Sequence, residues 1–109
     1  VLKDFVNKGY SEKNSVNRIQ RIVAEYFQVS VEDMKSKKRS ANLAFPRQVA
    51  MYLCRKLTNE SFPKIGIEFG GKDHSTVMHS VEKIEKEILT NKELANIIEK
   101  LKKEIVWCG

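Results

Sequence analysis

Apolar residues recur at helical spacing in four stretches of the chain, and this pattern predicts the principal elements. The stripes are Val16, Ile19, Ile22, Val23, Tyr26 and Phe27; Val49, Ala50, Leu53, Cys54 and Leu57; Val77, Val81, Ile84 and Ile88; and Leu94, Ile97, Ile98, Leu101 and Ile105. Steps of three and four residues place the members of each stripe on one face of a helix. No segment alternates apolar and polar residues as a half-buried strand would. We therefore predict an all-α fold, a compact helical bundle.

Residues with helix-capping character predict where these helices begin. Ser15 and Asn91 precede the first and last stripes as N-caps. Pro46 is a residue that the first turn of a helix tolerates, so we predict that the second long helix begins there and ends near Thr58. The sequence Ser-Val-Glu-Asp at residues 30–33 resembles a capping box with aspartate in place of glutamate, which predicts a further short helix.

Two adjacent glycines, Gly70 and Gly71, separate two segments that each carry helix signals. Residues 61–69 open with a serine cap, have Pro63 in the first turn and end at the glycines, which predicts a short helix. Asp73 is then predicted to cap the following helix by accepting the backbone N–H groups two and three residues further on. This order of signals is typical of a helix-turn-helix.

The second helix of this pair has a polar face that starts in its first turn. His74, Ser75 and Thr76 open that face, and His79 and Lys83 continue it. In a DNA-reading helix-turn-helix, the N-terminal residues of the second helix contact base edges. An ordinary antiparallel helix pair with a glycine turn explains the same periodicity, so the distribution of charge has to decide between the two interpretations.

Positive charge is concentrated in the segment that leads into this polar helix start. The chain has 109 residues, 41% of them hydrophobic, so it is long enough for one modest core and too short for two ordinary domains. Its net charge is +6. Residues 35–72 contain nine basic and two acidic side chains, whereas the remainder contains 11 basic and 12 acidic ones. Binding to phosphates requires such an electrostatic footprint.

The basic run at residues 35–40 has two interpretations. A loop of this composition is commonly just solvated. A basic loop held between two helices also places an arginine where it reaches a narrow, A·T-rich minor groove.

Catalytic and metal-binding patterns are missing from the sequence. Gly71-Lys72 is followed by Asp73 and therefore lacks the Gly-Lys-Ser/Thr unit of a phosphate-binding loop. His74 and His79 are five residues apart and cannot form the i,i+4 pair of a zinc helix. Cys54 and Cys108 have no paired spacing, so both are expected to be reduced thiols, Cys54 as core filler. We predict no catalytic residue and no metal ligand, although a triad scattered through the fold would escape this test.

Two classes of function remain. The first is a reader of double-stranded DNA, and the second is a helical interaction module whose basic face docks an acidic protein. Side chains of mixed hydrogen-bonding type at a helix start favour the first class, because base edges need short donors and acceptors in a confined groove. An acidic partner would require only charge.

The cellular setting follows from what the chain contains. It starts at Val1 instead of methionine, so a larger parent protein is expected. Nothing resembles a signal peptide, and no apolar run approaches the roughly 18 residues that span a bilayer, so we expect a soluble cytoplasmic protein without membrane contact. The absence of a spare coiled-coil heptad predicts that the isolated domain is a monomer.

Three segments carry a resemblance to a known family. Gly-Gly-Lys-Asp-His-Ser-Thr-Val-Met-His at residues 70–79, Ser-Lys-Lys-Arg-Ser at 36–40 and Pro-Arg-Gln at 46–48 resemble the C-terminal DNA-binding domain (domain IV) of the bacterial chromosomal replication initiator DnaA. The resemblance runs in order over residues 15–88. It implies sequence-specific binding to DnaA boxes of the TTATCCACA kind at the replication origin, for initiation and regulation of chromosomal DNA replication.

The resemblance also implies how the parent protein is organised. Residues 1–14 would be the tail of a preceding ATPase region with its linker, and residues 15–109 the helix-turn-helix DNA-binding domain. ATP would belong to the missing domain, so this chain would be no enzyme and would use no cofactor. Self-assembly would likewise run through the missing domains.

The resemblance assigns individual residues to DNA. The implied base contacts are Arg39 in the minor groove and Arg55, Pro63, Asp73, His74 and Ser75 in the major groove. The implied phosphate contacts are Lys38, Arg47, Gln48, Lys64, Lys72 and Thr76. Pairing of Arg55 with guanine, of Asp73 with a cytosine amino group and of Pro63 with a thymine methyl group agrees with the usual chemistry of base edges. The capping role of Asp73 alone would also explain that residue.

Four positions depart from the commonest family pattern. Ser75 stands where threonine is usual and would lose a methyl contact, and Arg55 replaces a lysine seen in some members. Ala41 and Phe45 occupy places often held by arginine, which removes two further backbone contacts and leaves the central motif intact.

Overall fold

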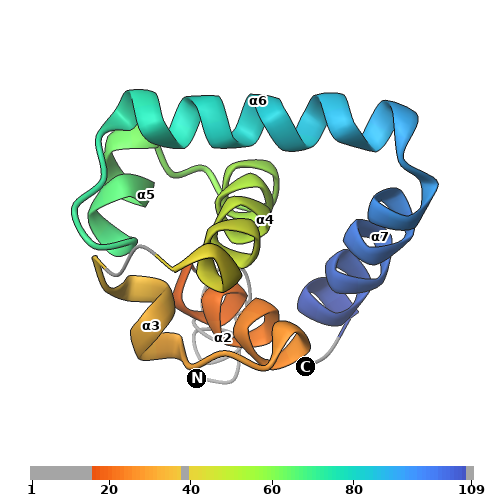
Figure 1. Cartoon of the computed structure of the whole chain (residues 1–109), viewed down its shortest axis with the longest axis horizontal. Helices are drawn as coiled ribbons and strands as arrows, with labels where there is room; N and C mark the ends of the chain where they lie inside the picture. The colour runs from red at the N-terminus through yellow and green to blue at the C-terminus, as the bar shows by residue number, and fades with distance from the viewer. Residues whose placement is uncertain (1–15, 38–39, 108–109) are drawn as a thin grey trace, which may run out of the picture.

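The computed structural model describes residues 16–37 and 40–107, and these form a bundle of helices (Figure 1). The helices are α2 (Val16–Phe27), α3 (Val31–Lys35), α4 (Ala41–Leu57), α5 (Phe62–Glu68), α6 (His74–Thr90) and α7 (Lys92–Trp107). The described ranges contain no strand, so the all-α prediction is confirmed. In Figure 1, α6 runs along the top of the bundle, α4 lies beneath it at the centre, and α5 and α7 lie at opposite ends of α6.

Helix α4 is the central element of the core and packs against both α2 and α6. Residues 49–54 are all buried, so this part of α4 is covered on every side. The apolar stripe predicted from the sequence therefore described only part of its buried surface, since Met51 and Tyr52 are buried as well. Cys54 is fully buried as predicted, and burial raises the pKa of its thiol well above the ordinary value, which keeps it protonated and unreactive.

The start of α4 differs from the prediction. The helix begins at Ala41, and Pro46 lies inside it instead of in its first turn. Leu43 is buried, and the ring of Phe45 meets the ring of Phe27 edge-on with 5.6 Å between centroids. Burial of these side chains outweighs the backbone hydrogen bond that an internal proline removes, so apolar packing extends the helix by more than one turn.

Three predicted caps, Ser30, Ser61 and Asn91, are present as side-chain hydrogen bonds. The hydroxyl of Ser30 accepts the backbone N–H of Asp33 at 3.0 Å, and Oδ1 of Asn91 accepts that of Leu94 at 3.1 Å. Each satisfies one of the N–H groups that a helix start leaves without an intrahelical partner. The predicted cap Ser15 and the predicted tail at residues 1–14 lie outside the described residues, so the domain boundary between them stays a prediction.

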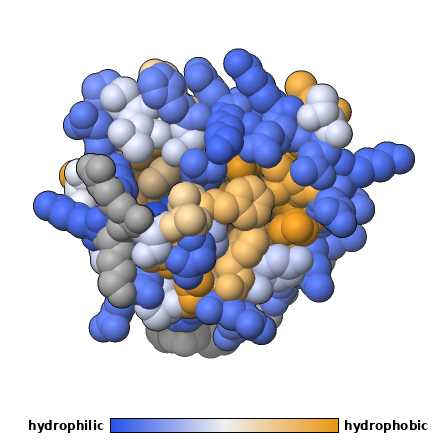
Figure 2. Space-filling model, viewed as in Figure 1, coloured by the Kyte–Doolittle hydropathy of each residue, from blue (hydrophilic) through white to orange (hydrophobic). Residues whose placement is uncertain are grey.

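Figure 2 shows hydrophilic residues around the rim of one face and apolar surface over α4 and towards α7. The large apolar side chains that are exposed among the described residues are Tyr26, Ile67, Leu89 and Val106. None of the described helices combines the length and apolar composition that a bilayer-spanning segment needs.

Candidate nucleic-acid interface

The turn between α5 and α6 is held close to the backbone of α5. Gly70 and Gly71 adopt φ values of +88° and +74°, a region that favours glycine, and α5 ends just before them as the sequence predicted. The backbone N–H of Lys72 donates to the carbonyl of Gly66 at 2.8 Å, which folds the turn back onto α5. A Cβ atom on Gly66 would overlap the carbonyl oxygen of Lys72. The sequence prediction missed Gly66, although an isolated glycine inside a helical segment is itself a signal of close backbone approach.

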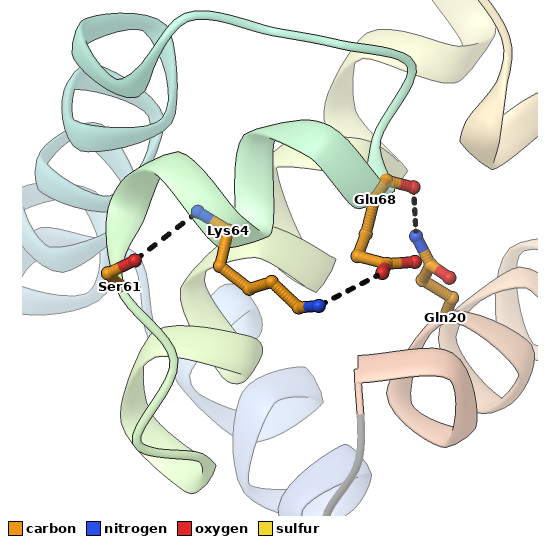
Figure 3. Close-up of polar contacts among 4 residues, drawn as sticks. All are labelled: Gln20, Ser61, Lys64 and Glu68. Carbon is orange, nitrogen blue, oxygen red and sulfur yellow. Dashed lines mark hydrogen bonds and ion pairs between the residues drawn. The ribbon is translucent and has the colours of Figure 1, made fainter.

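Helix α5 is anchored to α2 by a buried amide. The side chain of Gln20 is fully buried, and its Nε2 donates to the carbonyl oxygen of Glu68 at 2.8 Å (Figure 3). At the other end of α5, the hydroxyl of Ser61 caps the helix by accepting the N–H of Lys64 at 3.3 Å. Lys64 Nζ lies 3.9 Å from Glu68, and its side chain is 52% exposed, so this ion pair leaves the amine accessible.

The start of α6 differs from the prediction in one respect. Asp73 occupies the N-cap position with extended backbone angles, but its carboxylate makes no capping hydrogen bond. The predicted capping role of the side chain is therefore wrong. Because the helix start is exposed, its first N–H groups are accessible to solvent, and the helix does not require a side-chain cap.

The first turn of α6 projects from the bundle above a buried residue. Asp73, His74 and Thr76 are exposed and Ser75 is half-buried, whereas Val77 is fully buried. The predicted division of α6 into a buried and a free face is confirmed for this turn. A carboxylate, an imidazole and two hydroxyls therefore lie together at an accessible helix start, where both hydrogen-bond donors and acceptors are available.

Arg55 is oriented towards the start of α5 by two contacts. Its Nη1 donates to the carbonyl of Glu60 at 3.1 Å, and its guanidinium carbon lies 4.3 Å from the centroid of the Phe62 ring. The residue remains exposed, and Pro63 and Lys64 follow its partner Phe62 in the first turn of α5. Phe62 was not singled out from the sequence. An apolar residue after a helix cap looks like an ordinary core residue until its contact with Arg55 is known. Together the two contacts hold the guanidinium over the Phe62 ring.

Arg47 has a structural role that sequence reasoning did not foresee. The periodicity placed it off the apolar stripe, yet it is only 5% exposed. Its Nη2 donates to the carbonyl of Asp33 at 2.6 Å and to the carbonyl and hydroxyl of Ser36, both at 3.1 Å. Burial lowers the pKa of the Arg47 guanidinium, and the charge of Asp33 opposes that shift. Arg47 thus ties α4 to the end of α3, where the basic run begins, and its predicted phosphate contact stays a prediction.

The same end of α3 contacts the glycine turn. A Cβ atom on Gly70 would lie 2.7 Å from the carbonyl oxygen of Ser36 and 2.9 Å from that of Lys35. The turn and the beginning of the basic loop are therefore packed backbone to backbone. Lys38 and Arg39 lie outside the described residues, so their predicted phosphate and minor-groove contacts are not tested.

Two adjacent hollows lie along this surface. The smaller, of about 360 Å³, is lined by Lys37, Gly70, Gly71, Lys72, Asp73 and Thr76. The larger, of about 410 Å³, is lined by Ser40, Ala41, Ala44, Arg47, Gln48, Met51, Lys72, Thr76 and Ser80. Four residues predicted to contact phosphate line the larger hollow: Arg47, Gln48, Lys72 and Thr76. Lys72 and Thr76 also line the smaller hollow. Residues that are far apart in the sequence, 40–51 and 72–80, therefore line the same hollow.

The basic residues of the segment 35–72 are not equally available. Lys56 Nζ lies 2.7 Å from Glu85 on α6, and this hydrogen-bonded pair raises the pKa of Lys56. Lys35 and Lys37 are exposed, and Lys72 is half-buried at the glycine turn. Within the described part of the segment 35–72, the accessible positive charge thus lies around Arg55, α5, the turn and the start of the basic loop. Those ranges hold no group of three or more histidine, cysteine, aspartate or glutamate side chains placed to bind a metal ion.

Comparison with known proteins adds the following. Residues 16–84 match the family described as the bacterial dnaA protein helix-turn-helix. A chromosomal replication initiator protein DnaA from Geotalea uraniireducens is 47% identical over 106 residues, covering 97% of this chain and 23% of that protein. A solved structure titled "Crystal structure of DNA replication initiation factor" superposes with a TM-score of 0.76 at 33% identity, covering 94% of this chain and 31% of that one. The chain thus spans about a quarter of the length of this curated relative.

Proposed function

The chain belongs to the family of bacterial DnaA helix-turn-helix domains, and from this membership we propose that it binds double-stranded DNA by sequence. Its targets are DnaA boxes of the replication origin, and its role is the initiation and regulation of chromosomal DNA replication. The observation that carries the proposal is the exposed start of α6, where Asp73 makes no capping bond and a hollow lined by Lys72 and Thr76 lies alongside.

The proposal gives the chain no catalytic step. ATP binding and self-assembly belong to other parts of the parent protein, and DNA binding by this domain needs neither a metal nor a cofactor. The domain acts as a monomer in the bacterial cytoplasm, at the nucleoid.

Phosphate contacts position the domain in this mechanism. Gln48, Lys72 and Thr76 hold one backbone at the α4–α6 side, while Lys64 holds phosphate at the start of α5. Such contacts supply affinity and register without reading sequence. From the resemblance alone, Lys38 adds a phosphate contact and Arg39 enters the neighbouring minor groove, where a narrow A·T-rich groove attracts arginine.

Base contacts then select the site. The first turn of α6 enters the major groove, which is wide enough for a helix. The Asp73 carboxylate accepts from a cytosine amino group, and His74 and Ser75 reach neighbouring base edges. Arg55, held over the Phe62 ring, pairs with the two acceptors of a guanine, and Pro63 contacts a thymine methyl group.

The proposal favours DNA over an acidic protein partner for a chemical reason. An acidic partner would be repelled by the exposed carboxylate of Asp73, which lines the smaller hollow. A cytosine amino group, in contrast, requires such an acceptor.

The Asp73→Ala variant is expected to lose sequence preference while keeping its stability. Loss of the carboxylate should cost about 1 to 3 kcal/mol of discrimination between TTATCCACA and a duplex changed at the cytosine positions. Because Asp73 makes no capping bond, the free energy of unfolding should change by about 0.5 kcal/mol or less. Fluorescence anisotropy with both duplexes and urea unfolding measure the two quantities.

Asn91→Ala is the matched control for this variant, because Asn91 does cap a helix. It should cost about 1 kcal/mol of stability and leave the preference for the box unchanged. The assignment of Asp73 to a base is wrong if Asp73→Ala behaves like Asn91→Ala.

The Lys64→Ala variant separates overall affinity for DNA from sequence preference. It should weaken binding to the box and to a scrambled duplex by the same factor and flatten the logarithmic salt dependence by about one unit, since one phosphate contact is removed. Lys103→Ala, an exposed lysine on α7, should change neither quantity. A variant of Lys64 that alters the box-to-scrambled ratio would contradict the phosphate assignment.

A further inference from the structure

Hydrogen bonds fix the short connection between α4 and α5. The hydroxyl of Thr58 donates to the carbonyl of Cys54 at 2.6 Å and accepts the backbone N–H of Glu60 at 3.2 Å. Ser61, the next residue, caps α5 with its hydroxyl (Figure 3). The carbonyl of Glu60 and the side chain of Phe62, the first residue of α5, are therefore held in place in the free domain.

The Phe62 ring connects the core to an exposed charged side chain. The ring is half-buried and packs against the core. The guanidinium carbon of Arg55 lies 4.3 Å from the centroid of the ring. A cation over an aromatic face within about 6 Å of the centroid is attracted by the ring quadrupole. The core thus anchors the ring, and the ring in turn holds Arg55.

Arg55 keeps most of its hydrogen-bond donors for a ligand. Its Nη1 donates to the carbonyl of Glu60, and its Nη2 and Nε donate to no other residue in the described ranges. An arginine side chain that moves freely on a helix surface has many rotamers, and ordering it on binding costs affinity. Because two contacts restrict Arg55 in the free domain, part of that cost is removed before DNA binds.

Reading a guanine places a geometric demand on arginine, since N7 and O6 must accept from two donors of one guanidinium. We propose that Phe62 is a positioning residue for base reading, whose ring orders Arg55 so that the guanidinium meets both acceptors of a guanine. Phe62 itself contacts no base and acts only through Arg55. This inference rests on the proposed function and deepens it, because it adds a residue that determines specificity without touching DNA.

The Phe62→Leu variant tests this role, because leucine keeps an apolar side chain against the core and removes the ring. Affinity for the TTATCCACA duplex should fall about fivefold, which corresponds to about 1 kcal/mol. Affinity for a scrambled duplex should stay unchanged, since non-specific binding depends on phosphate contacts. Phe62→Tyr keeps the ring and should bind both duplexes as the wild type does. Fluorescence anisotropy measures all four affinities.

Tyr26→Leu is the matched control for the loss of a ring beneath a cation. Lys100 Nζ, on α7, lies 5.6 Å from the centroid of the Tyr26 ring on α2. The substitution removes a contact of the same kind from a pair of helices that carry no proposed DNA contact. It should change neither affinity.

Two further measurements show whether Phe62 acts through Arg55. In an Arg55→Ala background, Phe62→Leu should cause no further loss of affinity for the box. Each guanine opposite a cytosine of the box is also replaced in turn by 7-deazaguanine, which lacks the N7 acceptor. One replacement should weaken binding of the wild type, and the same replacement should weaken binding of Phe62→Leu by a smaller factor.

The outcomes separate this inference from the proposed function. If the wild type prefers the box and Phe62→Leu keeps the full preference, the positioning role is wrong and the proposed function stands. If Phe62→Leu weakens binding to both duplexes alike, the ring has only a structural role. If it weakens binding to the box equally without Arg55, Phe62 contacts DNA itself, and the inference is overturned. A wild type without any preference would contradict the proposed function and this inference together.

Discussion

The Gly66→Ala variant is expected to lose about 3 kcal/mol of stability and at least about 100-fold in affinity for the box. The added Cβ would overlap the carbonyl oxygen of Lys72 and lie 3.1 Å from its carbonyl carbon. Both are backbone atoms of the turn, so no side chain can rotate away to relieve the overlap. Alanine gains about 1 kcal/mol over glycine in a helix interior, which is too little to offset displacement of the turn.

The loss of binding follows from what the turn carries. Lys72, whose N–H bonds to the Gly66 carbonyl, directly precedes Asp73 and the first turn of α6. A displaced turn therefore moves the residues proposed to touch bases. Urea unfolding and anisotropy with the TTATCCACA duplex measure both effects.

Gly71→Ala is the control within the same turn. Gly71 has a positive φ of +74°, but nothing lies within 4 Å of the position a Cβ would take. Only the backbone penalty of about 1 to 2 kcal/mol remains, and binding should be largely kept. Equal effects of the two substitutions would show that backbone conformation, not the close approach at Gly66, governs the turn.

The Arg47→Met variant is expected to lose about 3 kcal/mol of stability. Methionine keeps the apolar stem but removes the charged donor that Nη2 supplies to the carbonyls of Asp33 and Ser36, and a hydrogen bond to a charged group is worth about 1.5 to 3 kcal/mol. The end of α3 and the basic loop should then lose their fixed position. Binding to any duplex should fall with them.

Arg47→Lys distinguishes this structural role from a phosphate contact. Lysine keeps the charge but not the planar fork, so it should recover little of the lost stability. If Arg47 served chiefly as a phosphate contact, Arg47→Lys would bind DNA nearly as the wild type does. In that case Arg47→Met would be stable and would only flatten the salt dependence by about one unit.

Local signals in the sequence were sufficient for much of the fold. Ser30 and Asn91 cap helices because a short polar side chain at that position finds the nearby N–H groups whatever the rest of the chain does. Gly70 and Gly71 mark the turn because their positive φ values exclude most other residues. These features depend on a few adjacent residues, so they can be predicted without knowing the packing.

Features that depend on distant partners were not predictable. Pro46 lies inside α4 because neighbouring apolar side chains find partners on other elements. Arg47 is buried because its guanidinium binds carbonyl groups at the end of α3. Periodicity alone had placed it off the apolar stripe of α4. Asp73 fits a cap by residue type, and only its side-chain placement shows that the capping bond is absent.

In the candidate site too, some features follow from local sequence and others depend on distant partners. The exposure of the first turn of α6 follows from its polar residues and from buried Val77. The hollow between α4 and α6 could not be predicted, because its lining combines residues 40–51 with residues 72–80 through the packing of two helices. Family resemblance named individual DNA contacts, which neither composition nor periodicity could supply.

Titration of the chain with a TTATCCACA duplex and a scrambled duplex over a range of salt concentrations tests the central claim most directly. Binding to both should weaken as salt rises, since phosphate contacts release counterions. The account predicts that a clear preference for the box persists at moderate salt, because base contacts at the start of α6 do not depend on released ions. Equal and steeply salt-dependent binding to the two duplexes would contradict it and leave only a basic helical module.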